Sequence, residues 1–293
     1  MSLSRTQDWL RSQNRFEDGR SEVRSIVKAK TISITSGKGG VGKTSLTIKF
    51  GKALAHAGHR VLVLDCDYNL SNTFIKLNLP VSNNFYAFIS NEKPFDKCLY
   101  KENNFHLLSG CNGNIDFVNR NIAFEKIIIN IINEHELEYD YILLDSPAGI
   151  GRENLILNAY TDFRFVIVTP DKSSITDSYS LIKILKNKYG IKNFHLLVNK
   201  VDGSSQYKRI IKSLSETVDH FLNCRLKILC GIENINLIGD KFDSLMAKNG
   251  HTEIDRKIIK VLKKFYEEGG EPHLYEGGGL LKNREQEVLK TLS

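Results

Sequence analysis

Short apolar segments alternate with longer amphipathic segments from residue 31 to about residue 266. The apolar segments are nearly continuous and often rich in Val and Ile, which is typical of strands buried on both faces of a parallel sheet. We expect strands over 31–36, 60–65, 105–109, 141–145, 164–169, 194–199 and 225–230, and helices over 43–57, 116–134, 173–188 and 204–222. The alternation predicts an α/β fold, in which a mostly parallel, doubly wound sheet is flanked by helices on both faces.

Composition divides the chain into three parts. Residues 1–30 are polar and indicate a tail or a short helix with a linker. Residues 31–266 hold the strand–helix alternation and are expected to form one domain. Residues 267–293 include a glycine pair near their start and predict a hinge followed by a short helix.

Overall composition excludes several classes of protein. Hydrophobic residues make up 41% and charged residues 26% of the 293 residues, which excludes collagen-like, disordered and integral-membrane chains. The N-terminus lacks the apolar core of a secretory signal. Five cysteines without a CxxC pair favour a reducing, cytoplasmic environment. The net charge of +7 favours an anionic partner, namely a nucleotide, a nucleic acid or a membrane surface.

A glycine-rich loop joins the first predicted strand to the first predicted helix. Residues 37–44 read G-K-G-G-V-G-K-T and match G-x-x-x-x-G-K-[ST] in the context that this motif requires. Glycines allow backbone N–H groups to surround phosphates, and the helix N-terminus adds partial positive charge. Lys43 can reach the β- and γ-phosphates, and the Thr44 hydroxyl can bind Mg²⁺. The predicted nucleotide-binding residues are Gly37, Lys38, Gly39, Gly40, Val41, Gly42, Lys43, Thr44 and Ser45.

A second lysine, Lys38, lies within this loop. The resulting K-G-G-x-G-K-[ST] pattern resembles the deviant Walker A family, which includes MinD, ParA and the flagellar regulator FlhG, also called FleN or YlxH. The resemblance implies an ATPase that binds ATP or ADP with Mg²⁺ and forms a homodimer with ATP. It also implies that Lys38 reaches the phosphates of the partner subunit, where a cation would stabilise charge on the transferred phosphoryl group.

Carboxylates follow the second predicted strand. Asp65 and Asp67 lie at its carboxyl end, which faces the ligand crevice in sheets of this kind, and alternation places them on the same side. One could orient an attacking water while the other binds Mg²⁺. The D-x-D-x-x-x-x-N pattern resembles the first switch of the family. It implies that Asp67 positions water and contacts the metal, that Asp65 supports it, and that Asn72 is a switch contact. Helix capping is the alternative role for Asp67.

Asp145 ends the strand predicted over 141–145 and begins D-S-P-A-G. This segment resembles the second switch of the family, which implies that Asp145 holds Mg²⁺ through water and that Gly149 lets the loop move. Capping of the next helix is the alternative. The predicted metal ligands are Thr44, Asp67 and Asp145, and the predicted catalytic residues are Lys38, Asp65, Asp67 and Asp145.

The base pocket is expected near Asn199 and Asp202, which belong to N-K-V-D at 199–202. The family resemblance implies that the asparagine binds the adenine edge. N-K-x-D is also the guanine-reading motif of GTPases, in which the aspartate accepts hydrogen bonds from guanine. We favour ATP and keep GTP as the alternative. The family usually has a proline-containing segment after the strand predicted over 225–230. Residues 231–234 read G-I-E-N instead, which predicts a differently shaped pocket.

The resemblance also implies partners for the two ends of the chain. Residues 5–11 partly match an N-terminal motif of the FlhG branch that contacts the GTPase FlhF, so residues 1–20 are the candidate region. Trp9 could anchor a groove or fold back on its own domain. A membrane-binding C-terminal helix is implied as well, but residues 280–292 form only a narrow apolar stripe. The helix expected near 254–265 has one apolar face, which favours packing on the sheet over membrane binding.

We therefore predict an ATP-dependent dimerising switch of the MinD/FlhG type that hydrolyses ATP and regulates the placement or number of flagella. It would be cytoplasmic and peripheral on the inner face of an anionic membrane. The alternative is a ParA-like ATPase that binds DNA nonspecifically for partition. Its lysines and arginine would come from Lys183, Lys186, Lys188 and Lys192, or from Lys208, Arg209 and Lys212. A metabolic or metal-centre enzyme is a third class, but Cys111 has no convincing partner cysteine for a bridging cluster.

Overall fold

The computed structural model describes residues 28–67, 73–77, 84–109, 123–235, 237, 240–247 and 252–270. The expected partner region at 1–20, the switch residue Asn72, Cys111 and the apolar stripe at 280–292 all lie outside these residues. The expected domain boundary near residue 266 stays a prediction.

An eight-stranded sheet forms the centre of the described structure, in the order β3-β4-β2-β5-β1-β6-β7-β8. Every pairing is parallel except that of β3 with β4. The strands are β1 (Lys30–Thr35), β2 (Val61–Asp65), β3 (Tyr100–Glu102), β4 (Phe105–Leu108), β5 (Tyr141–Asp145), β6 (Phe163–Val168), β7 (Asn193–Val201) and β8 (Arg225–Glu233). The α/β fold with a mostly parallel, doubly wound sheet is confirmed, and all seven predicted strands are present. The short antiparallel β3 was not predicted.

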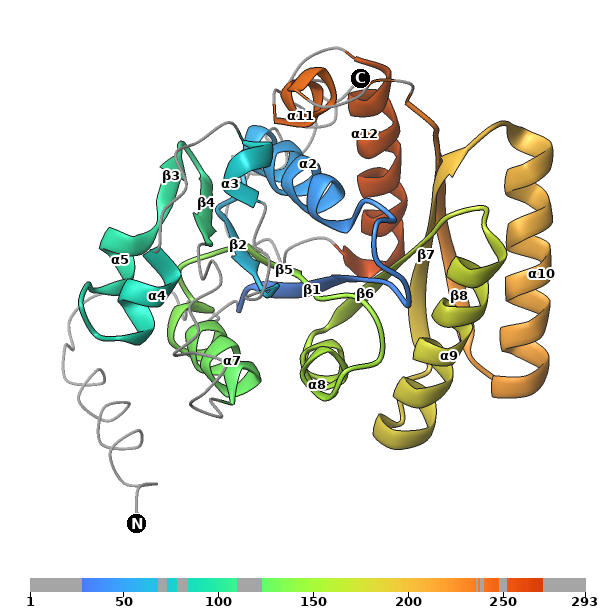
Figure 1. The fold of residues 1–293 in the computed structure, drawn as a ribbon, viewed down its shortest axis with the longest axis horizontal. Coiled ribbons are helices and arrows are strands. Elements are labelled where there is room, and N and C mark those ends of the chain that lie inside the picture. The colour runs from blue at the N-terminus through green and yellow to red at the C-terminus, as the bar shows by residue number, and fades with distance from the viewer. Residues whose placement is uncertain are drawn as a thin grey trace, which may run out of the picture.

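Helices cover both faces of the sheet (Figure 1). One face carries α2 (Lys43–His56), α11 (Asp240–Ala247) and α12 (Glu253–Phe265), after which the backbone leaves the helical conformation at Glu268 and Gly269. The other face carries α7 (Phe124–His135), α8 (Arg152–Tyr160), α9 (Lys172–Tyr189) and α10 (Ser204–Leu222). The short helices α3 (Thr73–Lys76), α4 (Asn84–Ile89) and α5 (Phe95–Cys98) lie near β4.

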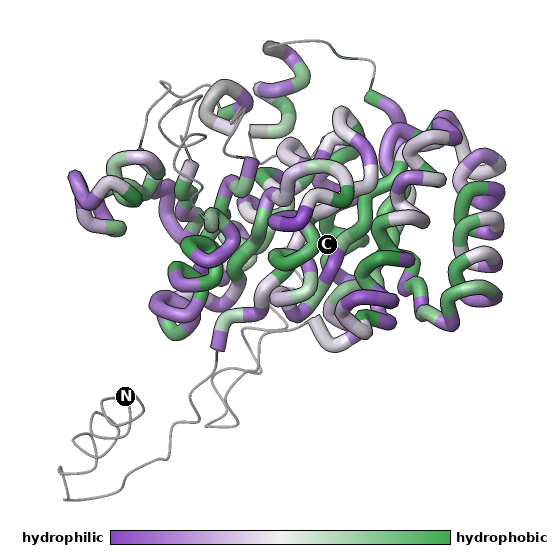
Figure 2. The backbone as a smooth tube through the Cα atoms, turned by 60° about the horizontal axis from the view of Figure 1, so that its bottom comes forward, coloured by the Kyte–Doolittle hydropathy of each residue, from purple (hydrophilic) through white to green (hydrophobic). Residues whose placement is uncertain are grey.

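Hydrophobic residues recur along the strands and in the helices (Figure 2), and many of them are buried in the core. Ile254, Ile258 and Phe265 of α12 are buried against the sheet, which confirms the packing expected for that helix. Thr252 and Asp255 form a reciprocal capping box at its N-terminus and satisfy amides that the helix itself leaves free. No helix in the described part of the chain has the length and apolar character needed to cross a membrane.

The central strand β1 differs from the expected pattern of two apolar faces. Ile32 and Ile34 join the core beneath α2, but the alternate residues Ser33 and Thr35 turn their hydroxyl groups toward α8. The hydroxyl of Ser33 donates to Asn158 Oδ1 at 2.9 Å, and both side chains are buried. A buried polar layer therefore joins α8 to the sheet, and its hydrogen bonds satisfy groups that would otherwise be costly to bury.

Candidate nucleotide-binding site

The glycine-rich loop connects β1 to α2 at the carboxyl edge of the sheet. Gly40 and Gly42 adopt left-handed conformations with φ of 76° and 99°, which glycine accommodates without steric strain. No side chain caps the first turn of α2, so its amides and the positive end of the helix dipole are open to an anion. Burial lowers the pKa of Lys43, while Asp145 and Asp67 oppose that shift. These features suit a phosphate group.

A cavity of about 560 Å³ lies against this loop. Its polar wall contains loop residues, carboxylates and β7 residues, and its apolar wall comes from the segment after β8 and from α11. The polar lining includes Gly39, Gly40, Gly42, Lys43, Thr44, Ser45, Asp67, Asp145, Ser146 and Asn199. The apolar lining includes Ile235, Leu237, Phe242 and Met246. The structure thus brings most of the predicted site residues together around one cavity.

Asp145 lies at the bottom of this cavity and is almost fully buried. The hydroxyls of Thr44 and Thr47 donate to its carboxylate, the latter at 3.3 Å. Burial and the negative charge of Asp65, its register partner on β2, raise the pKa of Asp145. A buried carboxylate with an unfavourable negative charge is suited to a cation.

Asp65 is also buried, but protein donors surround it. Its carboxylate accepts hydrogen bonds from the hydroxyls of Thr73 at 2.6 Å and Ser109 at 2.7 Å, and from the amide of Asp67 at 3.2 Å. Asp65 therefore ties the first turn of α3 and the end of β4 to β2, and the catalytic support expected of it stays a prediction. The sequence analysis did not predict Thr73 or Ser109 as partners of Asp65. Ser109 could have been recognised as a candidate, because it is a polar residue at the carboxyl end of the strand predicted over 105–109.

The segment after β5, in which the second switch was predicted, packs against the start of the phosphate loop. The amide of Gly149 donates to the carbonyl of Ser36 at 2.9 Å, and Asn154 Nδ2 donates to the carbonyl of Gly149 at 2.5 Å. Asn154 belongs to the polar layer between β1 and α8 through its contact with Asn158. The loop after β5 is thus hydrogen-bonded both to the phosphate loop and to α8.

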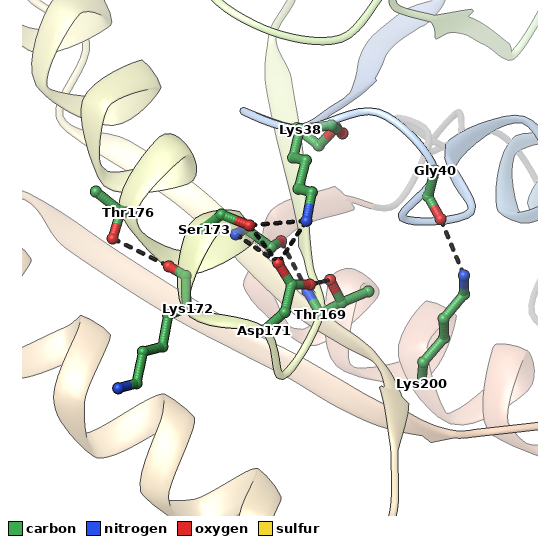
Figure 3. A network of polar contacts seen from close by, with 10 residues as sticks. Lys38, Gly40, Thr169, Asp171, Lys172, Ser173, Thr176 and Lys200 are labelled. Atoms are coloured by element: carbon green, nitrogen blue, oxygen red, sulfur yellow. Dashed lines mark hydrogen bonds and ion pairs between the residues drawn. The ribbon is translucent and has the colours of Figure 1, made fainter.

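Lys38 does not line the larger cavity. Its ammonium lies 2.7 Å from Asp171 Oδ1 and 2.7 Å from the Ser173 hydroxyl, both at the start of α9 (Figure 3). Partial burial opposes the shift, but hydrogen bonds from Lys38, Thr169 and Ser173 hold the pKa of Asp171 below its usual range. Asp171 was not predicted, although it comes two residues after the strand predicted over 164–169, near the edge of the sheet where Asp65 and Asp145 end their strands.

A smaller cavity of about 310 Å³ lies between Lys38, Asp171 and the end of β7. Asp202 lines this smaller cavity, whereas Asn199 lines the larger one and Lys200 lines both. The amide nitrogen of Asp202 donates to Gln206 Oε1 at 2.8 Å. The two ends of the N-K-V-D segment therefore face different cavities.

The chemistry of the larger cavity fits a magnesium nucleotide. Hydroxyl and carboxylate oxygens from Thr44, Asp67 and Asp145 are the ligand types that Mg²⁺ prefers. Within the described ranges, no group of three or more His, Cys, Asp or Glu side chains is placed to hold a metal by itself. Mg²⁺ commonly takes one or two protein ligands and completes its shell with phosphate oxygens and water.

Residues 32–272 match the model of the CobQ/CobB/MinD/ParA nucleotide binding domain. The chain belongs to this family. The family's members include the class expected from the phosphate loop, so the recognition made from residues 37–44 is confirmed. This CobQ/CobB/MinD/ParA chain is accordingly a P-loop ATPase.

Several proteins of known name are similar to the chain. The antiactivator FleN of Pseudomonas aeruginosa is 27% identical over 207 residues, which cover 70% of this chain and 74% of FleN. The flagellum site-determining protein YlxH of Helicobacter pylori is 30% identical over 217 residues, covering 71% of each chain. The structure of septum site-determining MinD with Mg-ADP from Pyrococcus horikoshii aligns with a TM-score of 0.67 at 20% identity, covering 83% of this chain and 98% of that one. The last similarity shows the shared fold.

Proposed function

We propose that the chain is an ATP-dependent dimerising switch that determines where, or in what number, flagella form. The observation that carries this proposal is the phosphate loop with a second, surface-exposed lysine, in a chain similar to the flagellum site-determining protein YlxH. A side chain at the surface can reach a second copy, whereas Lys43 is half-buried and close to Asp145 within its own copy. The two lysines are thus placed for different tasks.

The proposed roles at the site follow from position and charge. The amides of the loop and Lys43 would hold the phosphates, and Thr44, Asp145 and Asp67 would hold Mg²⁺ or its waters. The bound metal would neutralise charge on the phosphate oxygens. Asp67, at the cavity wall, would orient the attacking water, while Asp65 holds Asp67 through its backbone amide. Lys38 would contribute to the site of the second copy.

We also propose ATP as the nucleotide, with adenine near Asn199. The apolar wall formed by Ile235, Phe242 and Met246 offers a surface for a flat base in the same cavity as the phosphates. Asp202, which a guanine-reading motif would require at the base, lines the other cavity. Its placement supports ATP over GTP.

A ParA-like DNA-binding role is the second candidate. Lys208, Arg209 and Lys212 are all exposed on α10, and the chain carries a net charge of +7. An exposed basic helix face can bind the phosphate backbone of DNA regardless of its base sequence. Basic faces are also common on solvent-exposed helices that bind no nucleic acid. The site-determining role and the DNA-binding role therefore require a direct comparison.

Sedimentation with anionic liposomes and, in parallel, with plasmid DNA makes this comparison. We would use Asp67→Ala, which is expected to bind nucleotide but not hydrolyse it, with ATP, GTP and ADP. ATP-dependent lipid binding supports the site-determining role at a membrane on the cytoplasmic side. ATP-dependent DNA binding without lipid binding supports the partition role. Binding that is equal with ATP and ADP reports basic charge alone and contradicts a nucleotide switch.

The flagellar part of the proposal needs a cellular measurement. In the organism that encodes the chain, loss of the protein should change the number or position of flagella counted by electron microscopy. Complementation with Lys38→Ala should fail, because this variant lacks the lysine proposed to act across the dimer. Normal flagella in cells lacking the protein would contradict the flagellar role without affecting the ATPase assignment.

A further inference from the structure

The end of β7 is irregular where it meets the phosphate loop. The pairing of β7 with β8 shifts register between Val198 and Val201, and Lys200 adopts a left-handed conformation with φ of 58°. In a regular strand, Asn199 and Lys200 would point to opposite faces of the sheet. A bulge changes the direction of a side chain, and a non-glycine residue keeps a left-handed backbone only where its surroundings hold it there. The irregularity therefore calls for an explanation in terms of contacts.

Those contacts are with two consecutive peptides of the phosphate loop. Asn199 Nδ2 donates to the carbonyl of Val41 at 2.8 Å, and Lys200 Nζ donates to the carbonyl of Gly40 at 2.9 Å. Figure 3 shows the lysine reaching the loop at Gly40. The bulge thus allows the side chains of Asn199 and Lys200, although adjacent in the strand, to donate hydrogen bonds to the same phosphate loop.

Fixing a carbonyl also fixes the amide that follows it. In a trans peptide the C=O and N–H groups are coplanar and point in opposite directions. Holding the Gly40 carbonyl therefore sets the direction of the Val41 amide, and holding the Val41 carbonyl sets that of the Gly42 amide. Both glycines adopt left-handed backbone conformations and have no side chain to restrain them. Without these two donors, the loop peptides would be freer to rotate.

We propose that Lys200 is a positioning residue for phosphate binding: together with Asn199, it holds two loop peptides in the orientation that receives the phosphates. Its ammonium binds the phosphate loop and does not contact the nucleotide base. The inference rests on nucleotide binding at this loop, and it is independent of the flagellar and dimer roles. Under this inference, the lysine of the N-K-V-D segment positions the phosphate loop. The aspartate of the same segment, Asp202, lines the smaller cavity.

Four variants test this role. Lys200→Met keeps the aliphatic stem and removes the donor, whereas Lys200→Gly removes the donor and suits the left-handed backbone. Lys200→Arg restores a cationic donor. Lys172→Met is the matched control, because Lys172 is an exposed lysine at the start of α9 whose side chain points away from the loop in Figure 3.

The measurement is calorimetric affinity for ADP, ATP, GDP and GTP with Mg²⁺. We expect Lys200→Met and Lys200→Gly to bind ADP and ATP about tenfold more weakly, the value of one charged hydrogen bond. The ratio of ATP to GTP affinity should stay unchanged, because the lost contact concerns the phosphates. Lys200→Arg should recover most of the affinity, and Lys172→Met should match the wild type. Amide hydrogen exchange at Val41 and Gly42 should be faster in Lys200→Met without nucleotide.

Three outcomes would overturn the inference. ADP affinity equal to the wild type in Lys200→Met would show that the loop does not need the lysine. An altered ATP-to-GTP ratio would show that the lysine reads the base. A large drop in melting temperature, shared by Lys200→Met and Lys200→Gly, would show a role in folding. If the wild type itself failed to bind ADP, the nucleotide assignment would fail together with the inference, which distinguishes that case from the others.

Discussion

The ammonium of Lys38 and the carboxylate of Asp171 form an ion pair at 2.7 Å within a single copy of the chain. Asp171 is also the N-cap of α9, since its side chain accepts a hydrogen bond from the Ser174 amide at 2.9 Å. The lysine proposed to act on a second copy is therefore held by its own subunit. It must leave Asp171 before it can contact phosphates across a dimer.

Asp171→Asn should ease that release. Asparagine caps helices as well as aspartate does, so α9 should keep its first turn while the ion pair with Lys38 is lost. Exposed ion pairs contribute up to about 1 kcal/mol each, and a symmetric dimer would break two of them, so we expect ATP-dependent dimerisation at up to about thirtyfold lower protein concentration. Light scattering at several concentrations with the non-hydrolysing Asp67→Ala background would measure the change. Weaker dimerisation of Asp171→Asn would show instead that the carboxylate itself contributes to the dimer.

Gly37 is the position where the phosphate loop touches the backbone of α9. A Cβ atom placed there would lie 2.1 Å from the carbonyl carbon of Asp177 and 2.4 Å from the amide nitrogen of Ser178. Neither atom can move without displacing the helix. We expect Gly37→Ala to lower the free energy of unfolding by about 1–3 kcal/mol, measured by urea denaturation. Gly39→Ala, whose added Cβ would meet no atom within 4 Å, is the control and should unfold like the wild type.

Asp145, the proposed Mg²⁺ ligand, carries a stability cost in the folded protein. Because burial and Asp65 raise its pKa, its ionised form is disfavoured in the folded protein, and removing the charge should stabilise the fold. At pH 8 in EDTA, we expect Asp145→Asn to raise the melting temperature by at least about 2 °C. The same variant should lose the increase in ADP affinity that Mg²⁺ gives to the wild type. A lower melting temperature in EDTA would show that the carboxylate stabilises the fold even without a cation.

The sequence was most informative where a local pattern determines the structure. The phosphate loop is recognisable because its glycines, Lys43 and Thr44 are contiguous and stand between a strand and a helix. The strand β5 is equally clear from the sequence, because residues 141–144 form a continuous apolar run. In the structure all five of its residues are buried. Both features depend on neighbours in the chain, and both were predicted.

Contacts that depend on strand order were not predictable in the same way. Asp65 meets Ser109 because β4 pairs with β2, and it faces Asp145 because β5 pairs with β2 on the other side. Sequence alone does not state this order. The polar face of β1 was missed for a similar reason, since Ser33 finds its partner in Asn158, 125 residues away.

His195 provides a test of the core far from the phosphate loop. It lies on β7, is 2% exposed, and contacts the rings of Phe163, Phe165 and Phe265. Neither of its ring nitrogens has a hydrogen-bond partner among the described residues. Burial, followed by the positive charge of Lys227, lowers the pKa of His195 to about 4. The ring is therefore neutral in the folded protein at ordinary pH.

This lowered pKa predicts a specific loss of stability in acid. Between about pH 6.5 and the folded-state value, the unfolded chain binds a proton at His195 that the folded chain does not, so stability falls as the pH falls. The lost stability should amount to about 3 kcal/mol by pH 4. His195→Leu removes the titrating group and keeps an apolar side chain, so its unfolding free energy should fall less over the same range. Urea denaturation of both proteins from pH 7 to pH 4 measures the difference, in which all other titrating groups cancel. If the unfolding free energies of the two proteins changed in parallel with pH, His195 would accept a proton in the folded state. The aromatic cluster would then have to open and give the protonated ring a hydrogen-bond partner.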